Sequence, residues 1–255
     1  MRVLSLTRHE FRFDQKVFWR NPTAVFFTVL LPLMFLFVFN LLFGNEDIEE
    51  LGVNTSTYYV PAIIALAVIS ATAQSLAINL SADREAGMLK RVRGTPLPSS
   101  IFVVGRVGNS LVISILMVLV VALIGKVAYD VSVPSETIPA VLVTLAVGAA
   151  AFSCLGFALT AVIPTREAAP AVTNAFLLPL YFISGVFVPQ SEIPKGVLDF
   201  AGFFPVRPFF EAFFTAWDPN TAGAGFEWGQ LGIVAAWGLF GLLIALRFFR
   251  WEPRR

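Results

Sequence analysis

Apolar residues fill six long stretches of the sequence, and each stretch is long enough to cross a lipid bilayer as a helix. The predicted spans are residues 24–43, 58–80, 107–125, 137–163, 168–189 and 228–246. Their interiors contain no Asp, Glu, Lys or Arg. Pro32 and Pro179 interrupt two of them, which is tolerated because neighbouring groups satisfy the freed carbonyls. We therefore predict an all-α integral membrane protein with six transmembrane helices in a single domain, residues 1–255.

Residues 1–23, before the first span, have the pattern of a helix lying at the membrane surface. Basic residues recur every fourth position, at Arg8, Arg12, Lys16 and Arg20, and apolar residues occupy another side of the helix. Such a basic amphipathic helix binds at the level of the lipid headgroups. Glu10 and Asp14 project on the apolar side, either to pair with the basic residues at 84–93 or to reach water.

The charged segment 83–98 separates the second and third spans. Ser81 or Asp83 is a candidate N-cap for a short helix, and Gly94 with the prolines after it ends that helix. Met88, Leu89 and Val92 share one apolar face. Two interpretations stay open: a solvated loop whose basic residues fix the topology, or a helix that docks on a soluble partner. For the second interpretation the candidate residues are Asp83, Arg84, Glu85, Met88, Leu89, Lys90 and Arg91, with Glu10 and Asp14.

The composition agrees with a membrane protein and the charge distribution orients it. Hydrophobic residues make up 57% of the 255-residue chain, charged residues only 14%, and the mean hydropathy is +0.77. All lysines and arginines except Lys126, Lys195 and Arg207 fall on one side of the six-span topology. The positive-inside rule then places both termini and the segment 83–98 in the cytoplasm.

The segment 190–227 between the fifth and sixth spans is rich in aromatic residues, broken by prolines, and marked by several charges. Its pieces are too short to cross a bilayer. We expect short re-entrant helices in the outer leaflet, because backbone at that depth is helical or packed on protein. An aromatic belt at the interface is compatible with this arrangement.

Few residues carry catalytic chemistry. The chain has one histidine, His9, and one cysteine, Cys154, so a histidine-based catalytic or metal cluster and an intrachain disulfide are excluded. No G-x-x-x-x-G-K-[ST] loop occurs, so the chain does not bind a nucleotide in the P-loop manner. We expect no enzyme, no metal site and no cofactor in this chain, and an energy source elsewhere.

Polar side chains gather in the second and fifth spans. Amides and hydroxyls inside a membrane need partners, because burying them unpaired is costly. They either join helices by hydrogen bonds or line a path. The candidate path residues are Ser70, Gln74, Asn79, Asn174, Phe176 and Tyr181.

Four features in this order resemble type-2 ABC exporter permeases, the membrane subunits of ATP-driven ABC transporters. They are the amphipathic N-terminal helix, D-R-E-A-G-M-L-K-R-V-R-G-T-P-L-P at 83–98, I-S-G-V-F-V-P at 183–189, and F-P-V-R-P-F-F-E-A-F at 204–213 after an I-P near 193. The resemblance covers nearly the whole chain. It implies that residues 83–93 form the coupling helix of a six-span permease.

The resemblance also implies partners and a function. Two copies of a P-loop ATPase subunit would bind ATP and Mg, and a second permease copy, identical or paralogous, would complete the transporter. The expected substrate is an amphiphilic drug- or lipid-like compound exported from the cytoplasm or inner leaflet across a bacterial inner membrane. A glycan export permease of the same family is an alternative, and so is a membrane assembly factor without transport. No nucleic-acid partner is expected.

Overall fold

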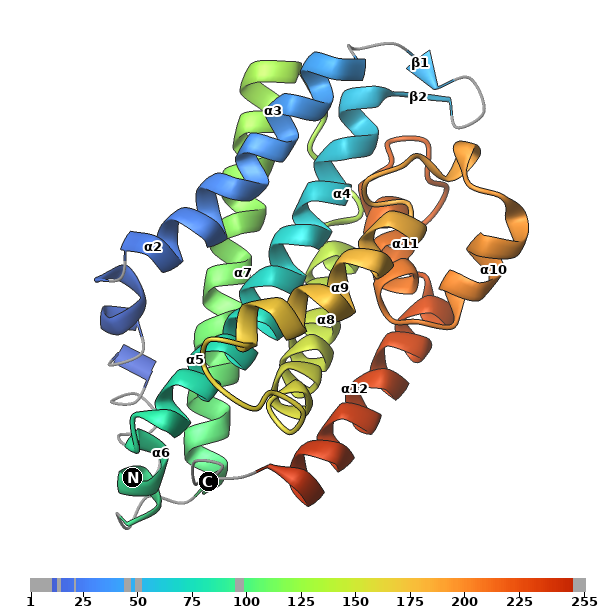
Figure 1. Cartoon of the computed structure of the whole chain (residues 1–255). Helices are drawn as coiled ribbons and strands as arrows, with labels where there is room; N and C mark the ends of the chain where they lie inside the picture. Colours follow the sequence, from blue (N-terminus) through green and yellow to red (C-terminus); the bar gives the residue numbers. More distant parts are fainter. Residues whose placement is uncertain are drawn as a thin grey trace.

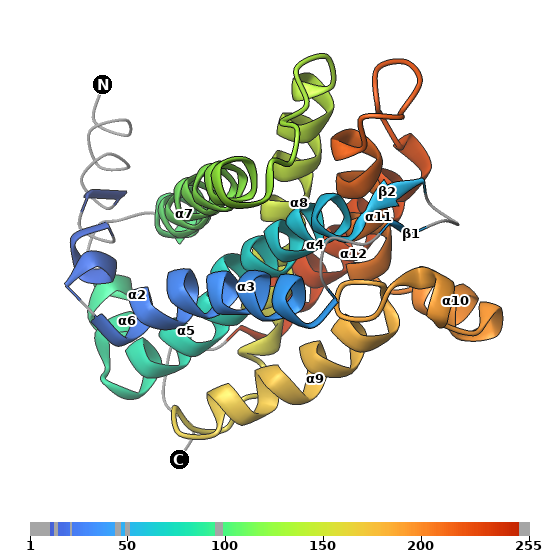
Figure 2. The same ribbon diagram turned by 90° about the horizontal axis from the view of Figure 1, so that it is seen from above.

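The computed structural model describes residues 11–12, 15–20, 22–43, 47–48, 52–94 and 99–249. Long helices run roughly side by side, with α6 at one end of the bundle and the short β-hairpin at the other (Figure 1). Figure 2 is seen from above and shows α4 near the middle of the bundle, where it contacts α3, α7, α8 and α11. Of the predicted interfacial helix at 1–23, the structure describes residues 11–12, 15–20 and 22–23, and all of these except residue 20 are helical.

In the first half of the chain, α4, η2 and α5 follow one another without a break and form one long helix that packs against α3 and α7. The elements are α2 (Pro22–Val25), the π-helical turn η1 (Phe26–Leu30), α3 (Leu31–Phe43), β1 (Asp47–Ile48), β2 (Val53–Asn54), α4 (Thr55–Ile69), the π-helical turn η2 (Ser70–Gln74), α5 (Ser75–Glu85), α6 (Met88–Arg93) and α7 (Ser99–Tyr129). β1 and β2 pair antiparallel, with Ile48 opposite Val53. The Asn54 side chain accepts a hydrogen bond from the Thr57 N–H at 2.8 Å and thereby caps α4.

The second half contributes α8 (Ile138–Leu159), α9 (Ala169–Ile183), the 3-10 turn η3 (Gln190–Glu192), α10 (Lys195–Gly202), α11 (Val206–Trp217) and α12 (Trp228–Phe248). Every residue of α4 is buried, as expected for a helix that is apolar on all sides and lies inside a bundle. α11 packs against α4, α8 and α12, and eight of its residues are buried.

Glycines let α8 approach two neighbours closely. A Cβ on Gly238 of α12 would lie 2.8 Å from the Ala151 Cα, and one on Gly241 would lie 2.9 Å from the Leu155 backbone nitrogen. On the other side, a Cβ on Gly156 would lie 2.8 Å from the Ala73 carbonyl oxygen in η2. Small residues at such contacts bring helix backbones together, which is how helices associate in membranes.

Within the described residues, four helices are long and apolar enough to cross a membrane: Thr55–Glu85, Ile101–Tyr129, Ile138–Leu159 and Trp228–Phe248. Two shorter apolar helices, Thr28–Phe43 and Ala169–Ile183, accompany them. This agrees with an all-α, multi-pass membrane protein. The predicted stretch 168–189 contains a helix only as far as Ile183, because Gly185 takes a left-handed conformation with φ of +92° and the chain turns there.

The predicted helix start near Ser81 or Asp83 is wrong, whereas the predicted end at Gly94 is confirmed, because Gly94 is the C-cap of α6. Ser81 and Asp83 lie inside α5, which continues the second span to Glu85, so neither residue is an N-cap. Gly87, with φ of +69°, separates α5 from the six-residue helix α6. A glycine in the left-handed conformation is a common end to a helix, and it places the break four residues later than the capping pattern predicted.

Candidate functional site

The second span contains a π-helical turn, η2, at the position where its polar residues gather. Single π-helical turns inside α-helices are rare and are frequent at functional sites. Here the turn packs against α7, α8 and α9. Thr72 is buried and donates to the Val68 carbonyl at 2.7 Å, so its hydroxyl is satisfied within its own helix.

Polar groups of η2 meet polar groups of α9. The Gln74 side-chain amide donates to the Asn174 side-chain oxygen at 2.9 Å, and both residues are half-buried. The Tyr181 side chain is buried beside Ser70, with no hydrogen bond of normal geometry to its hydroxyl among the described residues. The structure therefore brings four of the six candidate path residues together at one helix–helix contact.

The other two candidate path residues lie apart from this contact. Asn79 donates to the Ser75 hydroxyl at 3.1 Å, within α5 itself. Phe176 is 54% exposed, because the buried face of α9 runs through Thr173, Leu177 and Tyr181 at four-residue spacing. Phe176 instead belongs to an exposed apolar face of α9.

The charged end of the second span is fixed to the rest of the chain. Arg106 of α7 forms an ion pair with Asp83 at 2.5 Å. Arg84 is only 2% exposed, and its guanidinium donates to the backbone carbonyls of Thr160 at 2.8 Å and Ile163 at 2.7 Å. Arg84 therefore ties the end of α5 to the turn that follows α8, and it is not on the surface that a soluble partner would touch.

The candidate docking residues of α6 divide into buried and exposed. Leu89 is 1% exposed and packs with Leu80, Phe102 and Phe157 inside the chain. Met88 is 38% exposed. All three basic residues of α6 are exposed: Lys90, Arg91 and Arg93. Glu85, at the end of α5, is half-buried, and the predicted Glu10 and Asp14 lie outside the described residues.

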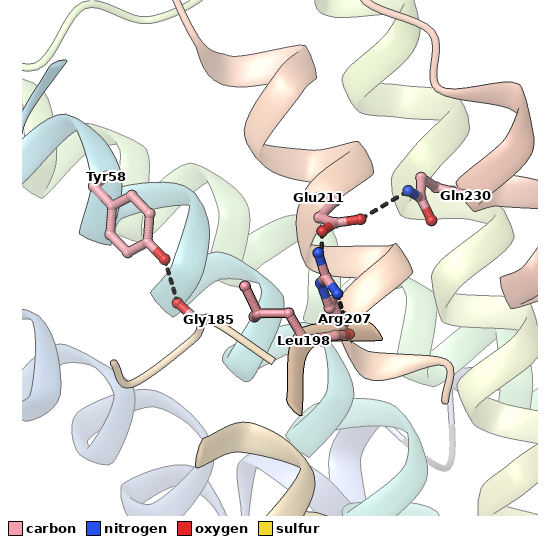
Figure 3. A network of polar contacts seen from close by, with 6 residues as sticks. All are labelled: Tyr58, Gly185, Leu198, Arg207, Glu211 and Gln230. Atoms are coloured by element: carbon pink, nitrogen blue, oxygen red, sulfur yellow. Dashed lines mark hydrogen bonds and ion pairs between the residues drawn. The ribbon is translucent and has the colours of Figure 1, made fainter. Parts of the chain in front are cut away.

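A polar network that the sequence analysis did not predict joins α10 and α12 to α11 (Figure 3). Arg207 Nε donates to Glu211 Oε1 at 2.7 Å, and the Gln230 side-chain amide donates to Glu211 Oε2 at 2.7 Å. Arg207 also donates to the Leu198 carbonyl. Burial raises the pKa of Glu211, Glu227 adds to the rise, and Arg207 opposes it. The i,i+4 spacing of Arg207 and Glu211 was the available signal for this pair.

The helices and their polar contacts define a multi-pass, α-helical membrane protein that has hydrogen-bonding groups inside the bundle. The chain belongs to the ABC-2 type transporter family, whose family model matches residues 3–216. It is 22% identical over 233 residues to a Bacillus subtilis (strain 168) protein named "Putative transport permease YvfS", covering 91% of this chain and 92% of that protein. The predicted resemblance is confirmed, and the chain is a membrane permease, a transport subunit rather than an enzyme. Permeases of this family generally work with an ATPase partner.

Proposed function

We propose that this permease belongs to an ATP-driven exporter and moves an amphiphilic drug- or lipid-like substrate out of the cytoplasm or inner leaflet. The observation that carries the proposal is the contact between Gln74 and Asn174 at the π-helical turn. It supplies amide groups inside a bundle whose buried side chains are mostly apolar. An amphiphile has a polar and an apolar part, so it needs both polar and apolar surfaces along its path.

The second copy of the permease would complete that path. α9 leaves an apolar aromatic face exposed beside the polar contact, with Phe176 and Phe182 each 54% exposed. A second α9 packed against this face would put aromatic rings next to the amides of Gln74 and Asn174. A dimer of permeases, identical or paralogous, is therefore part of the proposal.

The ATPase would act through α6, with both termini and α6 on the cytoplasmic side of a bacterial inner membrane. Met88, Lys90, Arg91 and Arg93 supply an exposed, basic surface on this helix. Leu89 anchors the helix to α7 and α8 through Phe102 and Phe157. Movement of α6 would then reach the helix bundle through this apolar contact rather than through a flexible loop.

Reconstitution with the partner P-loop ATPase tests the proposal. Proteoliposomes containing both proteins should accumulate fluorescent amphiphiles when ATP and Mg are present. An ATPase variant lacking its P-loop lysine is the control, and it should give no accumulation. Transport of a lipid-linked glycan, but of none of the fluorescent drug- or lipid-like compounds, would assign the protein to glycan export. Absence of any ATP-dependent transport, in a complex that hydrolyses ATP, would contradict the exporter proposal and favour an assembly factor.

A further inference from the structure

A partly open cavity of about 250 Å³ lies next to the Arg207–Glu211 pair, away from α6. Its walls come from α4 and, much later in the sequence, from η3, α11 and the start of α12. The lining includes Tyr58, Gln190, Glu211, Phe214, Glu227 and Gln230. Two carboxylates and two aromatic rings therefore face one space, which is separate from the polar contact of Gln74 and Asn174.

The charges around the cavity do not balance. Both oxygens of Glu211 are engaged, one by the Arg207 guanidinium and the other by the Gln230 amide. Among the described residues, neither a hydrogen bond nor an ion pair engages the side chain of Glu227, whose charge acts on Glu211 by repulsion. Arg207 neutralises one carboxylate, so the cavity keeps one net negative charge. A cationic occupant would supply the missing counter-charge.

The apolar part of the wall specifies the kind of cation. Phe214 lines the cavity, and its ring packs against the ring of Tyr58 with centroids 5.4 Å apart. Aromatic faces attract alkylated ammonium groups through cation–π interactions. The described residues contain no cluster of three or more metal-ligating side chains. One carboxylate beside aromatic rings suits an organic ammonium group better than a metal ion.

The size of the cavity sets how much of a ligand it can hold. Pockets for whole drug-sized ligands measure roughly 300–1,000 Å³. A cavity of about 250 Å³ is below this range and fits a compact head group, with the rest of the molecule outside. We propose that the cavity binds the ammonium head of a cationic amphiphile, with Glu227 as counter-ion and Phe214 and Tyr58 as aromatic walls. The inference rests on the proposed function, in which this amphiphile is the substrate leaving the transporter.

Binding of choline to the purified permease tests the inference without ATP or the ATPase. Titration calorimetry is performed in phosphatidylglycerol nanodiscs, with empty nanodiscs subtracted. Choline should bind, and dimethylbutanol, its uncharged carbon isostere, should not. Glu227→Gln should weaken choline binding by about 10- to 100-fold, because the close charge pair between the carboxylate and the quaternary ammonium is lost. Phe214→Leu should also weaken it, because the apolar volume remains and the aromatic face is lost.

Glu136→Gln is the matched control, because Glu136 is an exposed carboxylate outside the cavity. This variant should bind choline as the parent does. Equal affinity of the Glu227→Gln and Glu136→Gln variants, or equal binding of choline and dimethylbutanol, would overturn the inference. Repeating the titration in nanodiscs with phosphatidylethanolamine identifies the source of the ammonium: competition supports a lipid head group, and unchanged affinity supports a soluble amine.

The outcomes separate this inference from the proposed function. Glu227-dependent choline binding without ATP-driven transport would leave the ammonium site standing and reject the exporter. ATP-driven transport with choline binding that ignores Glu227 would keep the exporter and reject the site.

Discussion

Replacing Arg84 with methionine tests whether this residue holds the bundle together or serves a docking surface. Methionine has a similar length but donates no hydrogen bonds. In the structure the guanidinium spans two backbone carbonyls, those of Thr160 at 2.8 Å and Ile163 at 2.7 Å, and is 2% exposed. Both carbonyls would lose their charged donor in the variant.

The expected loss of stability follows from these two contacts. A hydrogen bond from a charged donor contributes about 1.5–3 kcal/mol, so two contribute about 3–6 kcal/mol. For a chain of this size each kcal/mol corresponds to about 2–4 °C in melting temperature, which predicts a decrease of about 6–24 °C. A surface contact with the ATPase would instead leave the isolated permease unchanged.

Thermal unfolding of the purified permease in detergent, followed by tryptophan fluorescence, measures the effect. Arg91→Met is the control, because it removes the same charge from an exposed position on α6. Arg84→Met should unfold well below both the parent and the control. Equal melting temperatures for the two variants would refute the structural role of Arg84.

Three further predictions concern packing, docking and pH. Gly156→Ala should destabilise the bundle by about 1–3 kcal/mol in the same unfolding assay, because its Cβ would crowd the Ala73 carbonyl. Gly232→Ala is the control, because a Cβ there meets open space and should leave the stability unchanged. Equal stability of the two variants would contradict the close contact at Gly156. Leu89→Asp should lower the thermal stability of the permease in the absence of any ATPase, because the leucine side chain is buried inside the chain. A normal melting temperature together with loss of ATPase pull-down would show instead that Leu89 belongs to the docking surface. The raised pKa of Glu211 means that the folded state binds this proton more tightly than the unfolded state. The stability from this group is therefore greatest at acidic pH and falls as the pH rises through the raised pKa. Glu211→Gln should flatten that part of the plot of melting temperature against pH, and an unchanged plot would contradict the burial of this carboxyl group as the source of the pH dependence.

The sequence by itself determined that the chain is a helical membrane protein, because apolar runs of this length span a bilayer as helices, which satisfy their backbone hydrogen bonds internally. It also indicated the family through the order of its motifs, and it located the polar residues of the second and fifth spans. These properties are local: they depend on which residues follow one another. The sequence also indicated that Gln74 and Asn174 need hydrogen-bond partners, because an intramembrane amide is costly to bury unpaired, and in the structure they bond to each other.

Only the tertiary structure decided which side of each helix is covered. Met88 and Leu89 are adjacent and both apolar, yet Leu89 is buried against Phe102 and Phe157 while Met88 is exposed. The sequence pattern predicts that Arg84 is a charge on the protein surface. In the structure it is buried, because two backbone carbonyls more than seventy residues away accept its hydrogen bonds. The cavity beside Glu227 forms where α11 returns against α4. Burial and charge balance depend on such long-range neighbours, which the spacing of residues along the chain does not contain.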